Sequence, residues 1–342
     1  MSTANSRAWV LNPKFGVEHL SLQQQELQAP ADDEVQLQVQ AVSLNYRDLL
    51  VIDGKYNPKQ PLPLIPCSDA AGQVVAVGSK VSKFAISDRV CPIFAQDWLA
   101  GPPTRHNLRS TLGSPRPGTL RTLLNVPEHA LVPLPQNLWT PSQAATFGCA
   151  GVTAFNALAG LTPGETVVVL GAGGVSIFAL QMAKAMGARV AITSSSDEKL
   201  KRAVDLGADF TVNYRNHQEW NRQILDWTER EGVDRVIEVG GAGTIAQSIR
   251  CLKPGGQAAM IGVLAGSTEP LNLLPLLMQQ LTIRGVIVGN RQDFENCLAF
   301  AAQHRLQPVV DQRFKFEEAP QALAYLAAAK HFGKVVIEVD GS

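Results

Sequence analysis

The chain has 342 residues, with 30 Lys and Arg balanced by 30 Asp and Glu, so its formal net charge at pH 7 is zero. This length exceeds the size at which one hydrophobic core usually suffices, and 45% apolar residues supply enough material for two cores. The neutral balance removes the electrostatic case for nucleic acid or an anionic membrane as the main partner. The charged share of 18% is also low for a disordered or coiled chain.

The start of the chain and its cysteines indicate a cytoplasmic protein. The N-terminal segment MSTANSRAWVLNPKF has no apolar core of signal-peptide length, and no run approaches the roughly 20 apolar residues that a membrane helix requires. The five cysteines have no CxxC spacing, and their odd number argues against a disulfide framework. We therefore expect reduced, mostly structural thiols at Cys67, Cys91, Cys149, Cys251 and Cys297.

The first part of the chain predicts a small β-barrel domain. Short strand-like runs, such as residues 34–45 and 70–79, are separated by prolines and glycines. Residues 97–119 are rich in Pro, Gly and Ser and predict a long loop. A loop of that length is usually a lid, a binding segment or disorder.

The most informative stretch is TVVVLGAGGVS, residues 166–176, an apolar run that ends in glycines and leads into a helix-like segment. A strand, a glycine turn and a helix together hold a dinucleotide pyrophosphate, because glycine lets the backbone approach the phosphates and the helix N-terminus faces the anion. Ser176 replaces the third glycine of the usual fingerprint, so the turn alone also fits a structural role. The predicted contacts are Gly171, Gly173, Gly174 and Val175.

Strand-like runs continue to alternate with amphipathic stretches after this turn, starting at residues 188, 209, 234, 256 and 282. This alternation predicts an α/β fold with a doubly wound parallel sheet of the Rossmann kind. Ligands of such sheets bind at the carboxyl ends of the strands. At those ends, the residues predicted to let the backbone come close to the ligand are Gly240, Gly262, Val263, Val288 and Gly289.

The end of the second strand of this sheet distinguishes NADP from NAD. An acidic residue there would bind the ribose of NAD and repel a 2′-phosphate, whereas this chain has Ser194 and Ser195, with Lys199 and Tyr214 nearby. Glu198 is explained by a capping box with Ser195. A charge pair at about 4 Å is worth roughly 4 kcal/mol at an effective dielectric of 20, so this exchange predicts NADPH. The alternative to a cofactor contact is a solvated helix lysine for Lys199 and a packed aromatic residue at a strand end for Tyr214.

The last part of the chain is expected to return to the first domain. A helix-like segment follows residue 290, and a final strand covers residues 333–339. The predicted organisation is a catalytic domain at 1–140, an NADP-binding domain at 141–289, and a return to the catalytic domain at 290–342.

Five segments in a fixed order carry a family resemblance. They are LNYRDLLVIDGKY from Leu44, IPCSDAAGQVVAVGS from Ile65, DRVCPI from Asp88, AATFGCAGVTAFNAL from Ala144 and HFGKVVIEV from His331. Together they resemble the medium-chain dehydrogenases/reductases, in the zinc-independent branch of quinone oxidoreductases and zeta-crystallin, across nearly the whole chain. The resemblance implies a GroES-like β-barrel catalytic domain beside the Rossmann domain, and a homodimer paired through the last strand of the cofactor domain.

The same resemblance predicts that no metal is bound. Asn45 stands where the zinc-dependent members have their first ligand cysteine, and Ser68 stands where they have a histidine. Only Cys149 remains at a ligand position, whereas a catalytic zinc requires three protein ligands around an open position. The four-cysteine structural zinc lobe is missing too, since Cys91 is the only cysteine between Cys67 and Cys149.

Without a metal to stabilise an alkoxide, an electron-poor acceptor is the easier substrate. A quinone or a conjugated carbonyl accepts hydride from NADPH while negative charge spreads to its oxygen, where a few hydrogen-bond donors suffice. The resemblance places Asn45, Tyr46 and Tyr56 as candidate donors in the cleft between the domains. It implies that Asp48 orients a ribose or an amide of the cofactor. It also implies that Thr153 contacts the nicotinamide half of the cofactor. The alternative for Tyr46 is a packing role beside the cofactor, and the alternative for Thr153 is a helix cap.

The sequence therefore predicts an NADPH-dependent oxidoreductase that reduces a quinone or an α,β-unsaturated carbonyl. Its partners would be small molecules and a second copy of the chain, with no nucleic acid and no membrane. Two alternatives stay open. One is a zinc-free reductase of simple aldehydes or ketones, and the other is a noncatalytic NADPH-binding protein with a structural, sensory or RNA-associated role.

Overall fold

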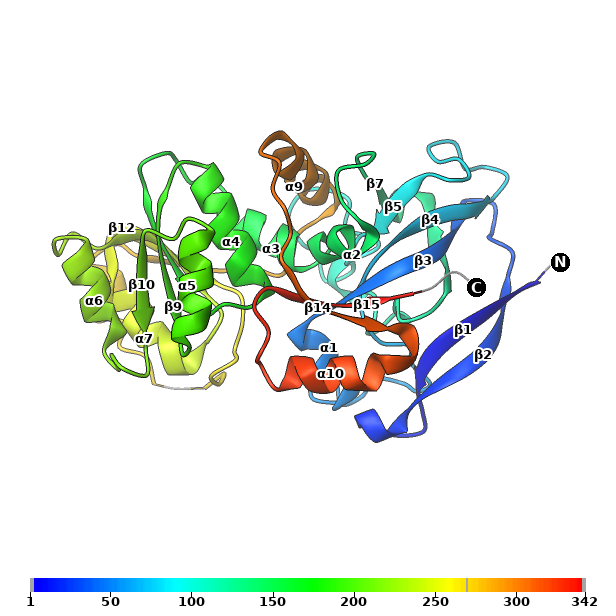
Figure 1. Cartoon of the computed structure of the whole chain (residues 1–342), viewed down its shortest axis with the longest axis horizontal. Helices are drawn as coiled ribbons and strands as arrows, with labels where there is room; N and C mark the ends of the chain where they lie inside the picture. The colour runs from blue at the N-terminus through cyan, green and yellow to red at the C-terminus, as the bar shows by residue number, and fades with distance from the viewer. Residues whose placement is uncertain (1–2, 269, 340–342) are drawn as a thin grey trace. The chain divides into compact units, whose positions relative to one another are not determined.

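The computed structural model describes residues 3–268 and 270–339, and the chain divides into two compact units. Unit 1 comprises residues 1–152 and 289–342, and unit 2 comprises Thr153–Val288 (Figure 1). The sequence analysis placed these boundaries at 140/141 and 289/290. Residues 141–152 belong to unit 1 because they pack on its sheet, and Ser142 Oγ there donates to Glu338 Oε1 at 2.6 Å.

Unit 1 is built on a seven-stranded, mostly antiparallel sheet, with a separate antiparallel pair before it. Only its strands β14 and β15 run parallel to each other. The pair consists of β1 (Thr3–Leu11) and β2 (Leu20–Gln28). The sheet runs in the order β14 (Val310–Lys315), β15 (Lys334–Glu338), β3 (Glu34–Leu44), β4 (Asp69–Val77), β5 (Arg89–Pro92) and β7 (Leu131–Pro133), and β6 (Leu123–Pro127) also pairs with β3.

Short helices cover this sheet, and α10 packs on β14 and β15 (Figure 1). The α-helices are α1 (Tyr46–Ile52), α2 (Pro141–Ala144), α9 (Arg291–Gln303) and α10 (Ala319–Ala327), while α3 (Ala150–Ala157) extends across the boundary into unit 2. Five 3-10 turns complete the described part of the unit: η1 (Val17–His19), η2 (Asn107–Arg109), η3 (Glu128–Ala130), η4 (Ala145–Phe147) and η5 (Phe316–Glu318).

The long strand β3 is the centre of unit 1. Its side chains Val35, Leu37, Val39, Ala41 and Val42 have no exposed surface. The last strand, β15, runs antiparallel to β3, as expected from its return to the first domain. In their register Val335 lies opposite Leu44, so the first residue of β15 comes beside the point where β3 ends. That point carries the polar residues described below.

Unit 2 confirms the predicted doubly wound parallel sheet. Six strands pair in the order β10 (Phe210–Asn213), β9 (Arg189–Ser194), β8 (Thr166–Leu170), β11 (Val233–Glu238), β12 (Leu252–Met260) and β13 (Thr282–Gly285). All five pairings are parallel. The chain winds outward from β8 to β10 and then crosses to β11, so the strand order reverses between β8 and β11. Such a reversal is where ligands of this fold bind.

Helices connect the strands of unit 2. They are α4 (Gly174–Ala185), α5 (Asp197–Asp205), α6 (Trp220–Trp227), α7 (Ala242–Arg250) and α8 (Leu274–Met278). Right-handed crossovers place α4 and α5 on one face of the sheet and α6 and α7 on the other. On the second face, Trp220, Ile224, Ile245 and Ile249 pack against buried valines of β8 and β11 in one apolar core.

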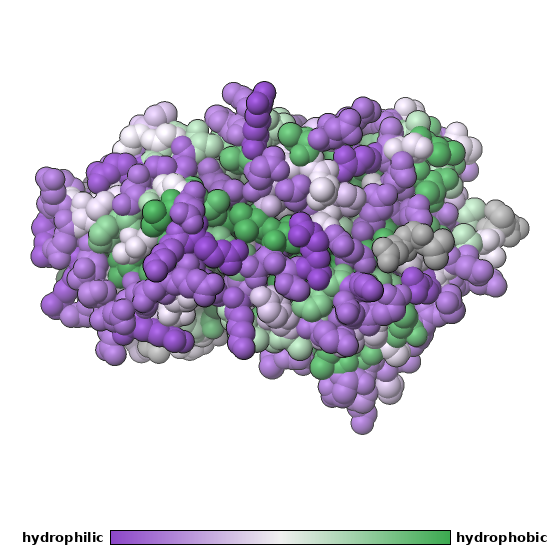
Figure 2. Space-filling view, viewed as in Figure 1, coloured by the Kyte–Doolittle hydropathy of each residue, from purple (hydrophilic) through white to green (hydrophobic). Residues whose placement is uncertain are grey.

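Hydrophilic residues cover most of the face shown in Figure 2, with hydrophobic residues in smaller patches. None of the helices formed by residues 3–268 and 270–339 is both long enough and apolar enough to span a membrane.

A buried carboxylate fixes the turn after β11. Glu238 has no exposed surface, and its Oε1 accepts from Gly240 N at 2.7 Å, Gly241 N at 3.0 Å and Thr244 Oγ1 at 2.6 Å. Its Oε2 accepts from Ser248 Oγ. Four donors around one carboxylate hold the start of α7 against the carboxyl end of β11. Gly241 has φ +83, a conformation that favours glycine.

We expect Glu238→Gln to lower the free energy of unfolding by about 1–3 kcal/mol, because an amide NH2 then faces groups that were donating to a carboxylate. Urea unfolding followed by circular dichroism measures this change. The matched control is Glu231→Gln, since Glu231 is exposed in the loop before β11. Equal losses in the two variants would contradict the role given to Glu238.

Candidate active site

Asn45 lies at the junction between β3 and α1 and begins a buried polar network. It is the N-cap of α1, and its side chain is half-buried. The amide Nδ2 donates to Asp69 Oδ2 at 3.0 Å, and the amide Oδ1 accepts from Lys334 Nζ at 2.6 Å. The predicted donor Asn45 is thus bound on both sides of its amide by oppositely charged side chains.

Asp48 holds the first turn of α1. Its carboxylate Oδ2 accepts from Asn45 N at 2.8 Å, and its side chain has no exposed surface. Burial raises the pKa of Asp48 from 3.8 to about 7, although the Asn45 hydrogen bond and the charges of Arg47 and Lys334 act in the opposite direction. Its other oxygen, Oδ1, is buried without a hydrogen-bond partner. This position favours the support of α1 over the predicted contact with a ribose or an amide.

Asp69, at the start of β4, is the acceptor at the centre of the network. Its Oδ2 accepts from Asn45 Nδ2 and from Cys149 N, both at 3.0 Å, and its Oδ1 accepts from Ser68 Oγ at 2.7 Å. Burial raises the pKa of Asp69, while the charge of Lys334 and these hydrogen bonds lower it. Three donors on a fully buried carboxyl favour its ionised form.

Lys334, the first residue of β15, provides the positive charge. Its side chain is only 4% exposed, and its Nζ donates to Leu44 O at 2.6 Å as well as to Asn45 Oδ1. The residue before it, Gly333, has φ +85, and a Cβ there would lie 2.5 Å from Val309 O. Glycine is therefore required where the chain turns to bring Lys334 to the end of β3.

The residues at the ligand positions do not fit a catalytic zinc. Ser68 is buried and donates to Asp69, and Asn45 is held between Asp69 and Lys334. Cys149 is the one thiol at these positions, and burial raises its pKa to about 12. Among residues 3–268 and 270–339, no three His, Cys, Asp or Glu side chains come together as a group that would hold a metal ion.

The two candidate tyrosines lie near this network and are partly exposed. Tyr46 is 46% exposed and Tyr56 is 41% exposed. The Arg47 guanidinium lies 4.5 Å from the centre of the Tyr56 ring and 4.9 Å from that of Phe94. Such cation–π contacts hold the Tyr56 ring beside Arg47 while its surface stays accessible.

Arg47 also anchors the long loop at residues 97–119. It donates from Nη1 to Leu112 O at 2.9 Å and from Nη2 to Ser114 O at 2.6 Å. The sequence predicts a lid, a binding segment or disorder for this loop. In the structure, the turn η2 lies at its middle, and its backbone pairs with itself through the bridge between Leu112 and Arg116.

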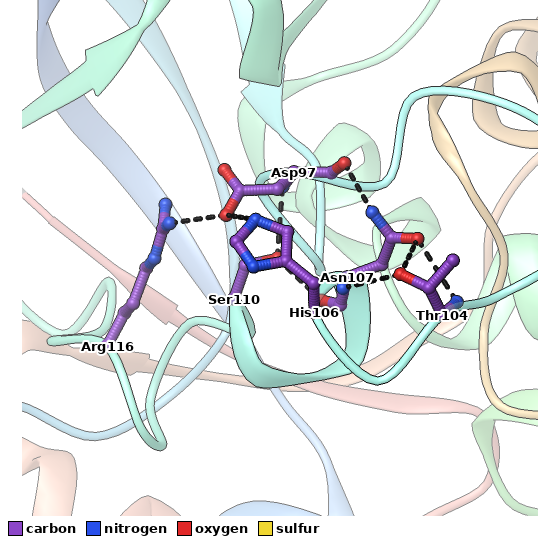
Figure 3. Close-up of polar contacts among 6 residues, drawn as sticks. All are labelled: Asp97, Thr104, His106, Asn107, Ser110 and Arg116. Atoms are coloured by element: carbon purple, nitrogen blue, oxygen red, sulfur yellow. Dashed lines mark hydrogen bonds and ion pairs between the residues drawn. The ribbon is translucent and has the colours of Figure 1, made fainter.

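Polar side chains within the loop hold its two halves together, as Figure 3 shows. The Asp97 carboxylate contacts Arg116 Nη2 at 2.6 Å and His106 Nε2 at 3.5 Å. Asn107 Nδ2 donates to Asp97 O at 2.7 Å, and Asp97 N donates to Ser110 Oγ at 3.0 Å. The loop is therefore an organised segment, and its hydrogen bonds argue against disorder.

In unit 2, the predicted phosphate turn joins the end of β8 to the start of α4. Gly171 follows β8 with φ +72, and Gly173 caps α4. The first backbone N–H groups of a helix have no partner within it, and here they belong to Gly174 and Val175. Ser176, at the position of the missing third glycine, is buried and donates from Oγ to Leu170 O at 2.7 Å. The turn fits a dinucleotide pyrophosphate, with Ser176 satisfying the end of β8.

The end of β9 corrects one detail of the sequence analysis. The N-cap of α5 is Ser196, whose Oγ accepts from Lys199 N at 3.4 Å, so the predicted capping box of Ser195 and Glu198 is wrong. The helix begins one residue later because Ser194 Oγ accepts from Ser196 N at 3.3 Å and forms the turn before it. Ser195 is half-buried beside this cap.

The other predicted contacts of the cofactor lie at or beyond the strand ends. Tyr214 follows β10, and its N donates to Ser194 O at 3.1 Å, while its side chain is 41% exposed. A Cβ on Gly240 would lie 2.3 Å from Thr244 Oγ1, and one on Gly262 would lie 2.6 Å from Val239 O. Both glycines are thus required by close packing. Val263, next to Gly262, is 46% exposed.

Two predicted contact residues lie outside the sheet, because β13 already ends at Gly285. Val288 has φ +50, a conformation that β-branched residues rarely adopt, and its O accepts from Asn156 Nδ2 at 2.9 Å. Gly289 belongs to unit 1, where a Cβ would lie 2.7 Å from Val152 Cγ1. The strand expected to continue to this point turns away at the boundary between the units.

Thr153 is not a helix cap, because α3 begins at Ala150 and Thr153 lies inside it with 2% exposure. The cap alternative of the sequence analysis is therefore wrong, and the contact with the nicotinamide half stays a prediction.

Three residues of these networks were missed by the sequence analysis: Asp69, Lys334 and Glu238. Each is a charged residue at one end of a strand: Asp69 begins β4, Lys334 begins β15, and Glu238 ends β11. Because charged residues are almost never fully buried unless they are paired, that position was an available signal for a functional or structural charge.

The phosphate turn on a parallel sheet and the organised polar network of unit 1 define a nicotinamide-dependent oxidoreductase. Comparison with known proteins gives the family. The family model described as alcohol dehydrogenase GroES-like domain matches residues 31–136, and that described as zinc-binding dehydrogenase matches residues 174–303. The chain belongs to the medium-chain dehydrogenase/reductase superfamily.

Individual relatives agree with this assignment. A zinc-type alcohol dehydrogenase-like protein of Schizosaccharomyces pombe is 42% identical, over 90% of this chain and 91% of its own length. The crystal structure of a putative alcohol dehydrogenase from Sinorhizobium meliloti is 38% identical, covers 99% of both chains and has a TM-score of 0.91. A quinone oxidoreductase from Pseudomonas syringae is 26% identical, covers 97% of this chain and 99% of its own, and has a TM-score of 0.82.

The raised pKa of Asp48 predicts a pH-dependent loss of stability. Between pH 3.8 and about 7 the unfolded chain ionises this carboxyl while the folded chain keeps it protonated, so stability falls as the pH rises through that window. Asp48→Asn removes the titration. We therefore compare the unfolding free energy of the variant with that of the wild type. The difference, variant minus wild type, should rise by about 2–3 kcal/mol from pH 5 to pH 8.

Urea unfolding of both proteins at several pH values measures this difference, in which the titration of all other groups cancels. A difference that stays constant across the range would contradict the protonated, buried state of Asp48.

Proposed function

We propose that this protein is an NADPH-dependent oxidoreductase that reduces a quinone or an α,β-unsaturated carbonyl without zinc. The observation that carries the proposal is the Asn45 amide, which stands at the first ligand position and is held between Asp69 and Lys334. The NH2 group of this amide presents a hydrogen-bond donor to a substrate in place of a Lewis acid. A conjugated acceptor suits such a site, because hydride addition spreads its negative charge to an oxygen that donors stabilise.

In this mechanism the nicotinamide of bound NADPH supplies the hydride. Unit 2 holds the cofactor through the glycine turn after β8 and through the N-terminus of α4. The side chains of unit 1 bind the acceptor. The Asn45 amide donates to the oxygen on which charge develops, and the hydroxyls of Tyr46 and Tyr56 are the further donors, with Tyr56 held by Arg47. Buried Asp48 keeps Asn45 at the start of α1.

The preference for NADPH is supported by the chemistry at the end of β9. Ser194 and Ser195 supply hydroxyls, and the half-buried Lys199 lies in the first turn of α5. A 2′-phosphate would be bound by these donors, by the positive charge, and by the helix N-terminus. The acidic residues Asp197 and Glu198 of the same turn are exposed.

We further propose that two copies of the chain associate in the cytoplasm through the edge of the unit 2 sheet. The strand β13 lies at that edge and offers backbone groups for pairing. Close to it in sequence, the short helix α8 leaves large apolar side chains in solvent. Their exposed fractions are 65% for Leu273, 60% for Leu274, 75% for Leu277 and 71% for Met278. A second copy placed on this surface would cover them.

A zinc-free reductase of simple aldehydes or ketones is the second candidate, favoured by the alcohol dehydrogenase names of the relatives. Oxidation of NADPH at 340 nm with quinones, enones and simple aldehydes decides between the two. We expect turnover with quinones or enones, with NADPH preferred over NADH. Turnover of simple aldehydes alone would favour the second candidate, and cofactor binding without any turnover would favour a noncatalytic protein.

The cofactor preference predicts that Lys199→Glu weakens NADPH binding at least about tenfold more than NADH binding, since a carboxylate then repels the 2′-phosphate. Fluorescence titration with each cofactor measures both dissociation constants. The control is Lys201→Glu, two residues further along α5, where the side chain is exposed. Equal losses for the two cofactors in Lys199→Glu would contradict the assignment.

A further inference from the structure

We propose that Lys334 is a positioning residue that holds the Asn45 amide in one orientation, with its NH2 group available to the hydride acceptor. The inference rests on the proposed function, since Asn45 is the donor in that mechanism. Lys334 stands 289 residues after Asn45 and is brought to it by the pairing of β15 with β3.

The orientation of the amide follows from the chemistry of its neighbours. An ammonium only donates hydrogen bonds, so the Asn45 atom at 2.6 Å from Lys334 Nζ is the carbonyl Oδ1. An ionised carboxylate only accepts, so the atom at 3.0 Å from Asp69 Oδ2 is the amide Nδ2. With both neighbours in place, the flipped amide would set its NH2 group against Lys334 and its oxygen against Asp69.

The same geometry leaves one donor for a substrate. Nδ2 carries two hydrogens, and the bond to Asp69 uses one of them. Asn45 is half-buried, whereas Asp69 and Lys334 are buried, so the amide is the member of the network that reaches the surface. The ammonium at Oδ1 also polarises the amide, and hydrogen bonds in a connected chain strengthen one another.

Charge balance ties Lys334 to this site. Two carboxyl groups, Asp48 and Asp69, are fully buried around it; Arg47 also acts on Asp48, whereas Lys334 is the cation that acts on Asp69. Arg47 is already used by the loop carbonyls and by the rings of Tyr56 and Phe94. Lys334 is thus the cation that contacts the Asn45 amide directly.

The test compares Lys334→Met, Lys334→Arg and the exposed control Lys330→Met for reduction of the best acceptor. We expect Lys334→Met to lower kcat about 10- to 100-fold, as for a misplaced catalytic donor, while the NADPH dissociation constant changes less than about twofold. Lys334→Arg keeps a group that only donates, and it should recover part of kcat. Lys330→Met should match the wild type.

Lys334→Met leaves the buried carboxylate of Asp69 without its cation, which threatens folding. The double variant Lys334→Met/Asp69→Asn removes this charge, and it is compared with Asp69→Asn alone. The proposal predicts a further fall in kcat in the double variant. Equal kcat values in these two folded proteins, or a folded Lys334→Met variant with wild-type kcat, would overturn it.

A readout without turnover separates this inference from the proposed function. The side-chain amide of Asn45 is observed in 15N-labelled protein and assigned by its loss in Asn45→Ser. Because the amide is held between Lys334 and Asp69, the hydrogen that it donates to Asp69 should exchange slowly with solvent in the wild type and rapidly in Lys334→Met. If no acceptor is reduced, the proposed function fails while this exchange still tests the orientation, and rapid exchange in the wild type would overturn it.

Discussion

The ammonium of Lys334 lies inside unit 1, and the surrounding polar groups are arranged to compensate its burial. An isolated charge in a protein interior is costly, so it has to be neutralised and hydrogen-bonded. Leu44 O and Asn45 Oδ1 accept hydrogen bonds from Lys334, and Asn45 Nδ2 donates a hydrogen bond to Asp69. Asp69 also accepts hydrogen bonds from Ser68 Oγ and Cys149 N. A single chain of contacts therefore joins β15, β3, β4 and the segment before α3.

This chain of contacts connects the fold with the chemistry. Members of the superfamily that use zinc need three ligands around an open position, and here the corresponding positions belong to a self-contained network of donors and acceptors. Unit 2 keeps the glycine turn that a nicotinamide cofactor requires, with Ser176 satisfying the end of β8. The chain thus retains a structure for binding a nicotinamide cofactor, and in the proposed mechanism the Asn45 amide faces the acceptor. Arg47 adds a second link, because it holds both Tyr56 and the loop at residues 97–119.

The sequence predicted the regular parts of the structure well. Alternating strand-like and helix-like runs were sufficient to predict the parallel sheet of unit 2, because apolar residues repeat with a different period in strands and in helices. Local turn chemistry was harder, since Ser195 and Ser196 are both good caps and only the Ser194 side chain decides between them. Asn45 was predicted as a donor from the resemblance. Its partner Lys334 was missed because their contact depends on the register of β15 against β3, which no local pattern specifies.

The central claim is that the acceptor is activated by the amide network and by no metal. The most direct measurement is the metal content of the purified protein together with kcat before and after exhaustive dialysis against a chelator. The account predicts far less than one zinc per chain and an unchanged kcat. One zinc per chain, with kcat lost on its removal and restored by its return, would contradict the account.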